Sequence, residues 1–414
     1  NAARQARSLR EELAALGADA TRDRLTGLLN REGAISRLSD AAASRQGCAV
    51  AVLDAAPAVL ARSAALQQKR LHGDETFSVN YLYFYNLLEK AIATLDDVDR
   101  YVRRRQALDG ETLRHGLSQE VMGLNDGGEW EWAFNLVGKY GLVPARCMSE
   151  TASSQSTRAL GVDLRERLAR AARTMRLHSA HRDRVRAIAL RDIIRVLVAH
   201  LGAPPVHVRR GARQLTPMQY AEEVAGFRAG EWRVVISNPL LPFQRVFERR
   251  GSALIDGSPR YNLRRLNVPA ARMRTLVRQS LERGYAVGFS ADIDRNDIDH
   301  ARGIMHPALY DRRRVYGTAI VRDLPRREDI YLGVASSKHA MAIVGVDVPT
   351  PGRGAVKYKV VNSWGPEFGD HGTYHMYAEW FEENVFKLAV HASVLTRGER
   401  AAYGQPKMLV GDFY

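Results

Sequence analysis

The chain has 414 residues, 45% of them hydrophobic, which is enough for one large domain or two ordinary ones. Two cysteines exclude a disulfide framework and no apolar run could cross a bilayer, so we expect a protein of the reducing cytoplasm without a membrane anchor. The net charge of +15 comes almost wholly from arginine, because only 8 of the 61 basic residues are lysines.

The positive charge is spread along the chain in arginine doublets and triplets. Spread charge of this kind can attract polyanions or acidic substrates. No basic stretch is interleaved with aromatic residues, as many nucleic-acid-binding proteins show. We therefore interpret most of the arginines as residues on solvent-exposed faces of the protein. Weak nucleic-acid binding through the arginines stays open as the alternative.

The N-terminal part predicts helices and shows no apolar leader. Ser8 and Glu11 have the spacing of a capping box, and Gly17 is typical of a helix end. Small residues at 41–48 predict a loop, and an apolar, Ala-rich helix follows Cys48.

The first half of the chain is predicted to be helical and the second half rich in strands. Apolar residues recur at helical spacing within 77–92 and within the charged segment 152–202. Thr216 followed by Pro217 predicts a further helix start. Strands are expected at 234–236, 285–293, 340–348, 357–364 and 386–390.

The sequence predicts neither a metal site nor a cofactor. His178 and His181 lie three residues apart on a predicted helix, but neighbouring arginines would repel a cation. Four aspartates follow a predicted strand: Asp292, Asp294, Asp297 and Asp299. They lack the glycine and the terminal glutamate of a calcium loop, so we interpret them as a surface loop. The sequence also contains no Gly-rich phosphate loop.

The strongest functional indication lies near the C-terminus. Two predicted strands joined by a turn rich in Pro and Gly would place His339 and Asn362 near each other at one end of a hairpin. A histidine held by an asparagine carboxamide is the base-and-orienter half of a cysteine nucleophile site.

Only two cysteines can complete such a site. Cys48 lies in the first turn of a predicted helix, and the partial positive charge of a helix N-terminus favours the thiolate. Cys147 lies in an extended or turn context without a nearby base, which is typical of a small buried hydrophobic residue. We therefore predict Cys48 as the nucleophile.

The sequence resembles the bleomycin hydrolase and aminopeptidase C family of papain-like cysteine peptidases over nearly its whole length. The blocks that carry the resemblance are Ser78-x-x-Tyr81-Leu82-x-Phe84, Asn125-Asp126-Gly127-Gly128-Glu129-Trp130, Lys139 to Pro144, Thr216-Pro217, Tyr310-Asp311, His339-Ala340-Met341, Asn362-Ser363-Trp364-Gly365 and Glu379-Trp380-Phe381. The resemblance implies an α+β papain-like fold, with a helical half carrying the cysteine, a β-barrel-like half carrying the histidine and asparagine, and helical insertions.

The resemblance also implies one catalytic unit over 1–414. Its parts would be an N-terminal helical part with the nucleophile (1–150), a helical insertion (152–232), a strand-rich part (233–400) and a C-terminal arm (401–414). Family members assemble as hexameric barrels with their sites facing an inner channel, where some bind nucleic acid. A homohexamer acting on a peptide or amide substrate is therefore expected.

Site roles follow from the same resemblance. Cys48 would be the nucleophile, His339 the general base and then acid, and Asn362 the residue that orients the imidazole. Trp364 would shield the His–Asn hydrogen bond from water. The block Asn125-Asp126-Gly127-Gly128 would line the substrate groove, where glycines let a peptide backbone approach.

The sequence departs from the family around the nucleophile and at the C-terminus. Relatives carry a Gln six residues before the cysteine and a Trp directly after it, where this chain has Ala42 and Ala49. Gln46 is the remaining side chain that could replace the missing oxyanion donor. Relatives end in an arm whose terminal carboxylate captures the substrate amine. Here a shorter arm would leave the cleft more open, or would place Asp412 or the Tyr414 carboxylate at a different depth.

We thus expect a cysteine-dependent hydrolase that cleaves amide or peptide bonds through an acyl-enzyme on Cys48, in the manner of an aminopeptidase. Two alternatives stay open at this point. One is a specialised amide hydrolase or acyl transferase of natural-product metabolism. The other is a catalytically weak hexameric binding scaffold.

Overall fold

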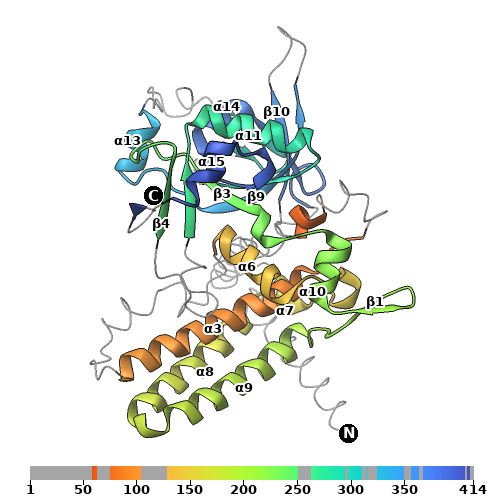
Figure 1. Cartoon of the computed structure of the whole chain (residues 1–414), viewed down its shortest axis with the longest axis vertical. Coiled ribbons are helices and arrows are strands. Elements are labelled where there is room, and N and C mark those ends of the chain that lie inside the picture. Colours follow the sequence, from red (N-terminus) through yellow and green to blue (C-terminus); the bar gives the residue numbers. More distant parts are fainter. Residues whose placement is uncertain are drawn as a thin grey trace, which may run out of the picture. The chain divides into compact units, whose positions relative to one another are not determined.

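The computed structural model describes residues 58–62, 75–103, 128–249, 263–293, 297–309, 314, 324–348, 356–362, 367–405 and 408–410. All of them lie in one compact unit, Cys48–Tyr414 (Figure 1). Within this part of the chain, no helix is both long and apolar enough to cross a membrane.

Helices dominate the described residues before position 232. Their bounds are α3 (Val79–Arg103), α6 (Trp130–Tyr140), α7 (Ala152–Gln155), α8 (Arg158–Leu177), α9 (Arg182–Leu201) and α10 (Pro217–Gln219). Further helices of the described residues lie among the later strands: α11 (Ala270–Glu282), α13 (Arg326–Tyr331), α14 (Ala378–Asn384) and α15 (Arg397–Ala402).

The predicted helical periodicity of 77–92 and 152–202 is confirmed. On α8 the buried side chains recur every three or four residues: Leu160, Leu164, Leu168, Ala171 and Met175. This stripe and the matching one on α9 pack against α3, so the three long helices lie together (Figure 1). The start at Thr216 is also confirmed, because its hydroxyl accepts from the Gln219 N–H in a capping box.

The strands form one large sheet and a separate short hairpin. In sheet order the eleven strands are β13 (Met408–Leu409), β4 (Arg245–Arg249), β5 (Leu263–Asn267), β3 (Trp232–Ile236), β12 (Val385–His391), β6 (Val287–Ala291), β9 (His339–Asp347), β10 (Lys357–Val361), β11 (Thr373–Tyr377), β8 (Ile304–Met305) and β7 (Ile298–Asp299). The hairpin pairs β1 (Val208–Arg210) with β2 (Arg213–Leu215). All five expected strands are present, and the fold is mixed α and β.

The central strands of the large sheet are buried on both faces, because a hydrophobic core lies against each face. On β9, Ala340 packs into the core that contains α3, α6, α8 and α9, whereas Met341 and Ile343 pack into the core that contains α11 and α14. The same alternation occurs on β12, where Ala389 faces the first core and Leu388 the second. The sheet therefore separates two hydrophobic cores.

The register between β9 and β10 shifts by one residue. Lys359 pairs with Gly345 and Val360 pairs with Ile343, which leaves Val344 as an extra residue on β9. Such a bulge lets the two ends of a hairpin keep different pairings.

The prediction that Asp292 and Asp297 lie in a surface loop is wrong. Both residues are fully buried. Asp292 is covered because its carboxylate accepts a hydrogen bond from the Ser336 N–H and forms an ion pair with Lys338, both in the loop before β9. Asp299 is partly buried, and Asp294 lies outside the described residues.

Candidate active site

The pair expected from the hairpin is in place. His339 opens β9 and Asn362 directly follows β10, and their side chains meet through His339 Nε2 and Asn362 Oδ1 at 3.0 Å. His339 is buried and Asn362 is partly buried. A second link holds the asparagine backbone, because its N–H donates to the Gly372 carbonyl at 3.3 Å.

This contact decides which ring nitrogen of His339 carries the proton. A carboxamide oxygen can only accept, so Nε2 must donate to Asn362 Oδ1. In the neutral ring the lone pair then lies on Nδ1, the atom that can take a proton from a nucleophile. The hydrogen bond thus fixes one tautomer and one orientation of the His339 ring.

The surroundings of His339 disfavour its charged form. Burial, followed by the charge of the nearby His300, lowers the pKa of His339 to about 4, although the Asn362 hydrogen bond raises it. His300 is itself held by Tyr374, whose hydroxyl lies 3.2 Å from His300 Nδ1. An imidazolium at neutral pH would therefore require an anion beside the ring.

The loop that delivers His339 is fixed by a buried carboxylate. Asp292 accepts a hydrogen bond from the Ser336 N–H at 3.3 Å and forms an ion pair with Lys338 Nζ at 3.4 Å. The Lys338 N–H also donates to the Ala291 carbonyl at 3.0 Å, next to the pairing of Ala291 with His339. Asp292 therefore holds both the backbone and the side chain of the segment that enters β9.

Helix α6 is anchored to the strand beside β9. Trp130 Nε1 donates to Ser290 Oγ at 2.9 Å, and Ser290 pairs with Ala340, the residue after His339. The Trp130 ring covers Gly288 so closely that an added Cβ there would lie 2.4 Å from the ring. Glycine at 288 thus lets α6 approach the sheet at this distance.

Four charged side chains cluster behind the start of α6. Arg265 on β5 donates to Glu129 at 2.6 Å and to Glu131 at 2.8 Å, and Lys387 on β12 donates to Glu129 at 2.9 Å. The Arg265 side chain is 0% exposed and that of Lys387 is 9% exposed. Burial raises the pKa of Glu129, but the charges of Arg265 and Lys387 outweigh it and lower that pKa to about 2. The ionised cluster ties the residue after Gly128 to two strands.

The described residues include only part of the predicted site. His339, Asn362 and Gly128 are described, and Gly128 is partly exposed immediately before Glu129 and α6. The other predicted site residues lie outside the described residues: Gln46, Cys48, Asn125, Asp126, Gly127, Trp364 and Tyr414. Ala42 and Ala49 also lie outside them. Cys147 packs at the edge of the first core and is partly buried.

Sequence reasoning missed the residues that support the pair. Lys387 is a lysine inside an apolar strand, which is a signal for a buried partner of opposite charge. Arg265 was hidden in an arginine doublet, and Asp292 in an acidic stretch. In the described ranges, no group of three or more His, Cys, Asp or Glu residues is arranged to hold a metal ion.

Comparison with known proteins identifies the family of this chain. The model of the Peptidase C1-like family matches residues 60–411. Aminopeptidase W of Lactobacillus delbrueckii subsp. lactis is 29% identical over 333 residues, covering 76% of this chain and 73% of that protein. Human bleomycin hydrolase (Homo sapiens) is 27% identical over 346 residues, covering 78% and 74%.

A solved structure shows the same fold. The crystal structure of PepW from Lactobacillus rhamnosis superposes with a TM-score of 0.72 and 24% identity, covering 85% of this chain and 81% of that chain. At this identity the superposition speaks for the fold alone.

Proposed function

Because the chain belongs to the Peptidase C1-like family, we propose that it is a cysteine peptidase that cleaves amide bonds through an acyl-enzyme on Cys48. The observation that carries this proposal is the hydrogen bond from His339 Nε2 to Asn362 Oδ1. It leaves the proton-accepting lone pair on Nδ1 of the neutral ring, as a base for a cysteine nucleophile requires.

The proposed reaction has two steps. The Cys48 thiolate attacks the substrate carbonyl carbon, the C–N bond breaks, and the His339 imidazolium gives its proton to the leaving amine. Water then attacks the thioester while His339 takes one of its protons. The acid product leaves, and the thiolate and imidazolium are restored. Asn362 keeps the ring in one tautomer throughout.

We further propose an aminopeptidase-like specificity, since relatives bear the names aminopeptidase W and aminopeptidase C. In this proposal the Asn125-Asp126-Gly127-Gly128 segment lines the groove, Trp364 shields the His–Asn pair, and Tyr414 lies at the end of the groove that takes the substrate amine. The protein would act as a cytoplasmic homohexamer.

One feature of the sequence favours a second candidate function. Ala42 and Ala49 stand where a side-chain oxyanion donor and a Trp are expected, and losing one such donor typically costs about a hundred- to thousandfold in rate. Unless Gln46 supplies the donor, the site would be slow in hydrolysis. It would then serve as a specialised amide hydrolase, an acyl transferase or a weakly catalytic scaffold.

Intact-mass analysis separates these functions. The protein is incubated with matched aminoacyl amides and N-blocked peptidyl amides, and adducts are located by comparing wild type with C48A and C147S. An acyl adduct that C48A loses and C147S retains, formed faster from substrates with a free amine, supports the aminopeptidase proposal. An adduct released by amines but stable in water supports acyl transfer, and no adduct on Cys48 contradicts the enzymatic proposal.

A further inference from the structure

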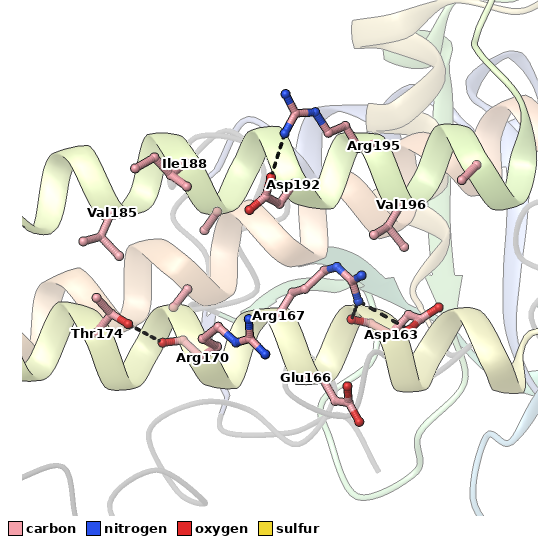
Figure 2. Close-up of a pocket in the computed structure, with 13 residues that line it drawn as sticks. Asp163, Glu166, Arg167, Arg170, Thr174, Val185, Ile188, Asp192, Arg195 and Val196 are labelled. Carbon is pink, nitrogen blue, oxygen red and sulfur yellow. Dashed lines mark hydrogen bonds and ion pairs between the residues drawn. The ribbon is translucent and has the colours of Figure 1, made fainter.

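A groove runs between α8 and α9 on the side away from α3. It encloses about 620 Å3 (Figure 2). In Figure 2, α3 passes behind α8 and α9. Val185 and Val196 of α9 lie toward the space between the two helices, and Arg167 and Arg170 extend from α8. The groove is remote in sequence from the His339–Asn362 pair and takes no part in the proposed reaction.

The lining of the groove combines aliphatic and charged side chains. Its apolar part comes mainly from α9, where Ile188 is 42% exposed beside the more buried Ala189 and Val196. The charged part alternates in sign: Asp163, Glu166, Arg167, Arg170, Asp192 and Arg195. Some of these charges already pair along their own helix, as Arg167 with Asp163 and Arg195 with Asp192.

The two helices that form the groove are strongly basic. Residues 158–201 contain eleven arginines and four acidic residues, a surplus of seven that is almost half of the net charge of +15. Arg170, Arg173, Arg176, Arg184 and Arg191 are exposed. A groove with an aliphatic floor inside a basic surface favours an occupant that is both apolar and acidic.

Two other occupants fit this surface less well. A nucleic acid would find no Phe, Tyr or Trp on α8 or α9 on which its bases could stack, and its bases would not use the aliphatic floor as leucine-type anchors would. A second copy of the chain would bring two surfaces with a surplus of seven positive charges together, which is unfavourable at low ionic strength.

We infer that the α8–α9 groove binds an acidic amphipathic helix of a partner protein. Such a helix would lay leucine- or isoleucine-type anchors at i, i+3, i+4 and i+7 over Ile188, Ala189 and Val196, completing a helix packing that has α3 on its other side. Its carboxylates would face Arg170 and the exposed arginines around the rim.

A designed peptide tests this inference on the full-length protein. The probe is a fluorescent 21-residue peptide with leucines at the helical anchor positions and glutamates elsewhere, and the control peptide has the same composition in scrambled order. Fluorescence anisotropy at low and high salt gives the affinities. We expect the ordered peptide to bind more tightly and to weaken as salt rises.

Matched variants locate the binding site. I188Q removes an aliphatic side chain from the groove, and V162Q removes one of equal exposure from α8 outside the lining. We expect I188Q to weaken binding about five- to tenfold and V162Q to leave it unchanged. R170Q and R184Q remove the same charge, but Arg170 lines the groove and Arg184 does not, so we expect R170Q to weaken binding about threefold more than R184Q.

Three outcomes would overturn the inference. Equal affinity for the ordered and scrambled peptides would show attraction by charge alone. In a second outcome, a single-stranded oligonucleotide displaces the peptide and binds I188Q and wild type equally well. That result would assign the surface to nucleic acid. Self-association that I188Q weakens, measured by sedimentation velocity, would assign the groove to a second copy. Circular dichroism of each variant verifies that the helices are intact.

Discussion

Protonation of His339 controls what the candidate site can do. Burial lowers the pKa of His339 to about 4, so at pH 7 the isolated ring is neutral. The proposed resting state, an imidazolium beside a thiolate, can therefore exist only if the Cys48 thiolate raises that pKa. Each partner then stabilises the charge of the other.

Ultraviolet titration tests this dependence. We expect wild type and C147S to show thiolate absorbance at neutral pH, and we expect C48A and H339A to lose it, because an imidazolium is needed to keep the thiol ionised. C147S is the matched control for the loss of a cysteine. Thiolate absorbance that persists in H339A would contradict the pair.

The same burial predicts how stability depends on pH when the thiolate is absent. In C48A, His339 would have a folded-state pKa of about 4 against about 6.5 in the unfolded chain. The unfolded state binds the proton first, so stability is full above pH 6.5 and is lost as pH falls toward 4, by at most about 3 kcal/mol. Urea denaturation of C48A and C48A/H339L across this range measures the effect, which should disappear in the double variant.

Replacement of Asn362 separates orientation from charge. N362A removes the acceptor of the Nε2 proton, and we expect kcat/KM to fall about 10- to 100-fold. N362D keeps an acceptor oxygen but adds a negative charge, so it should retain more activity and shift the pKa of His339 upward. Equal losses in N362A and N362D, with no change in the pH profile, would argue against the orienting role.

The charged cluster behind α6 makes its own prediction. R265M leaves the partly buried Glu129 and Glu131 with only Lys387 as a cationic partner in the cluster, and we expect it to lower the free energy of unfolding by about 3–5 kcal/mol. The double variant R265M/E131Q removes one uncompensated carboxylate and should recover part of that loss. A loss below about 1 kcal/mol in urea denaturation would contradict a compensated buried cluster.

At the scale of elements, the contact between α6 and β6 depends on a missing side chain. G288A would place a Cβ 2.4 Å from the Trp130 ring, so α6 must shift. We expect the free energy of unfolding to fall by about 1–3 kcal/mol. G230A is the control, because nothing lies within 4 Å of an added Cβ there. Thermal unfolding of both variants compares them, and similar melting temperatures would show that α6 is not held at this distance.

The elements with strong periodicity could be predicted from the sequence, and the arginine-rich ones could not. The stripe on α8 and the apolar run of β9 each follow one clear spacing. Strands β4 and β5 escaped because Arg245, Arg249, Arg264 and Arg265 obscure the alternation, and the burial of Arg265 follows from carboxylates more than 130 residues away in the chain. Local pattern cannot anticipate a partner that only the fold brings near.

Of the candidate site, too, only the part that depends on a local pattern could be predicted from the sequence. The His339–Asn362 contact follows from one hairpin, a local feature, and the structure confirms it. The contacts around that pair come from separate segments: Asp292 after β6 holds the loop before His339, Trp130 joins α6 to β6, and Lys387 of β12 joins Glu129 at the start of α6. The Cys48 half of the site stays a prediction.

At the scale of the whole molecule, charge and assembly are linked. Six chains of net charge +15 repel one another, so if the protein forms the proposed homohexamer, salt should strengthen it by screening. Sedimentation equilibrium at 50 mM and 500 mM salt should show more hexamer at the higher concentration. A hexamer that dissociates as salt rises would instead indicate contacts held mainly by ion pairs between subunits.

The extra residue at Val344 has a consequence for engineering this protein. The pairing register of β9 and β10 changes between Lys359 and Val360. The register at the end near His339 is therefore not set by the register at the other end of the two strands. The end near His339 is clamped instead by β6 on one side and β11 on the other. Insertions, deletions or an affinity tag between positions 348 and 356 should therefore be tolerated without displacing the imidazole, which makes the hairpin tip a suitable place for labels and grafted loops.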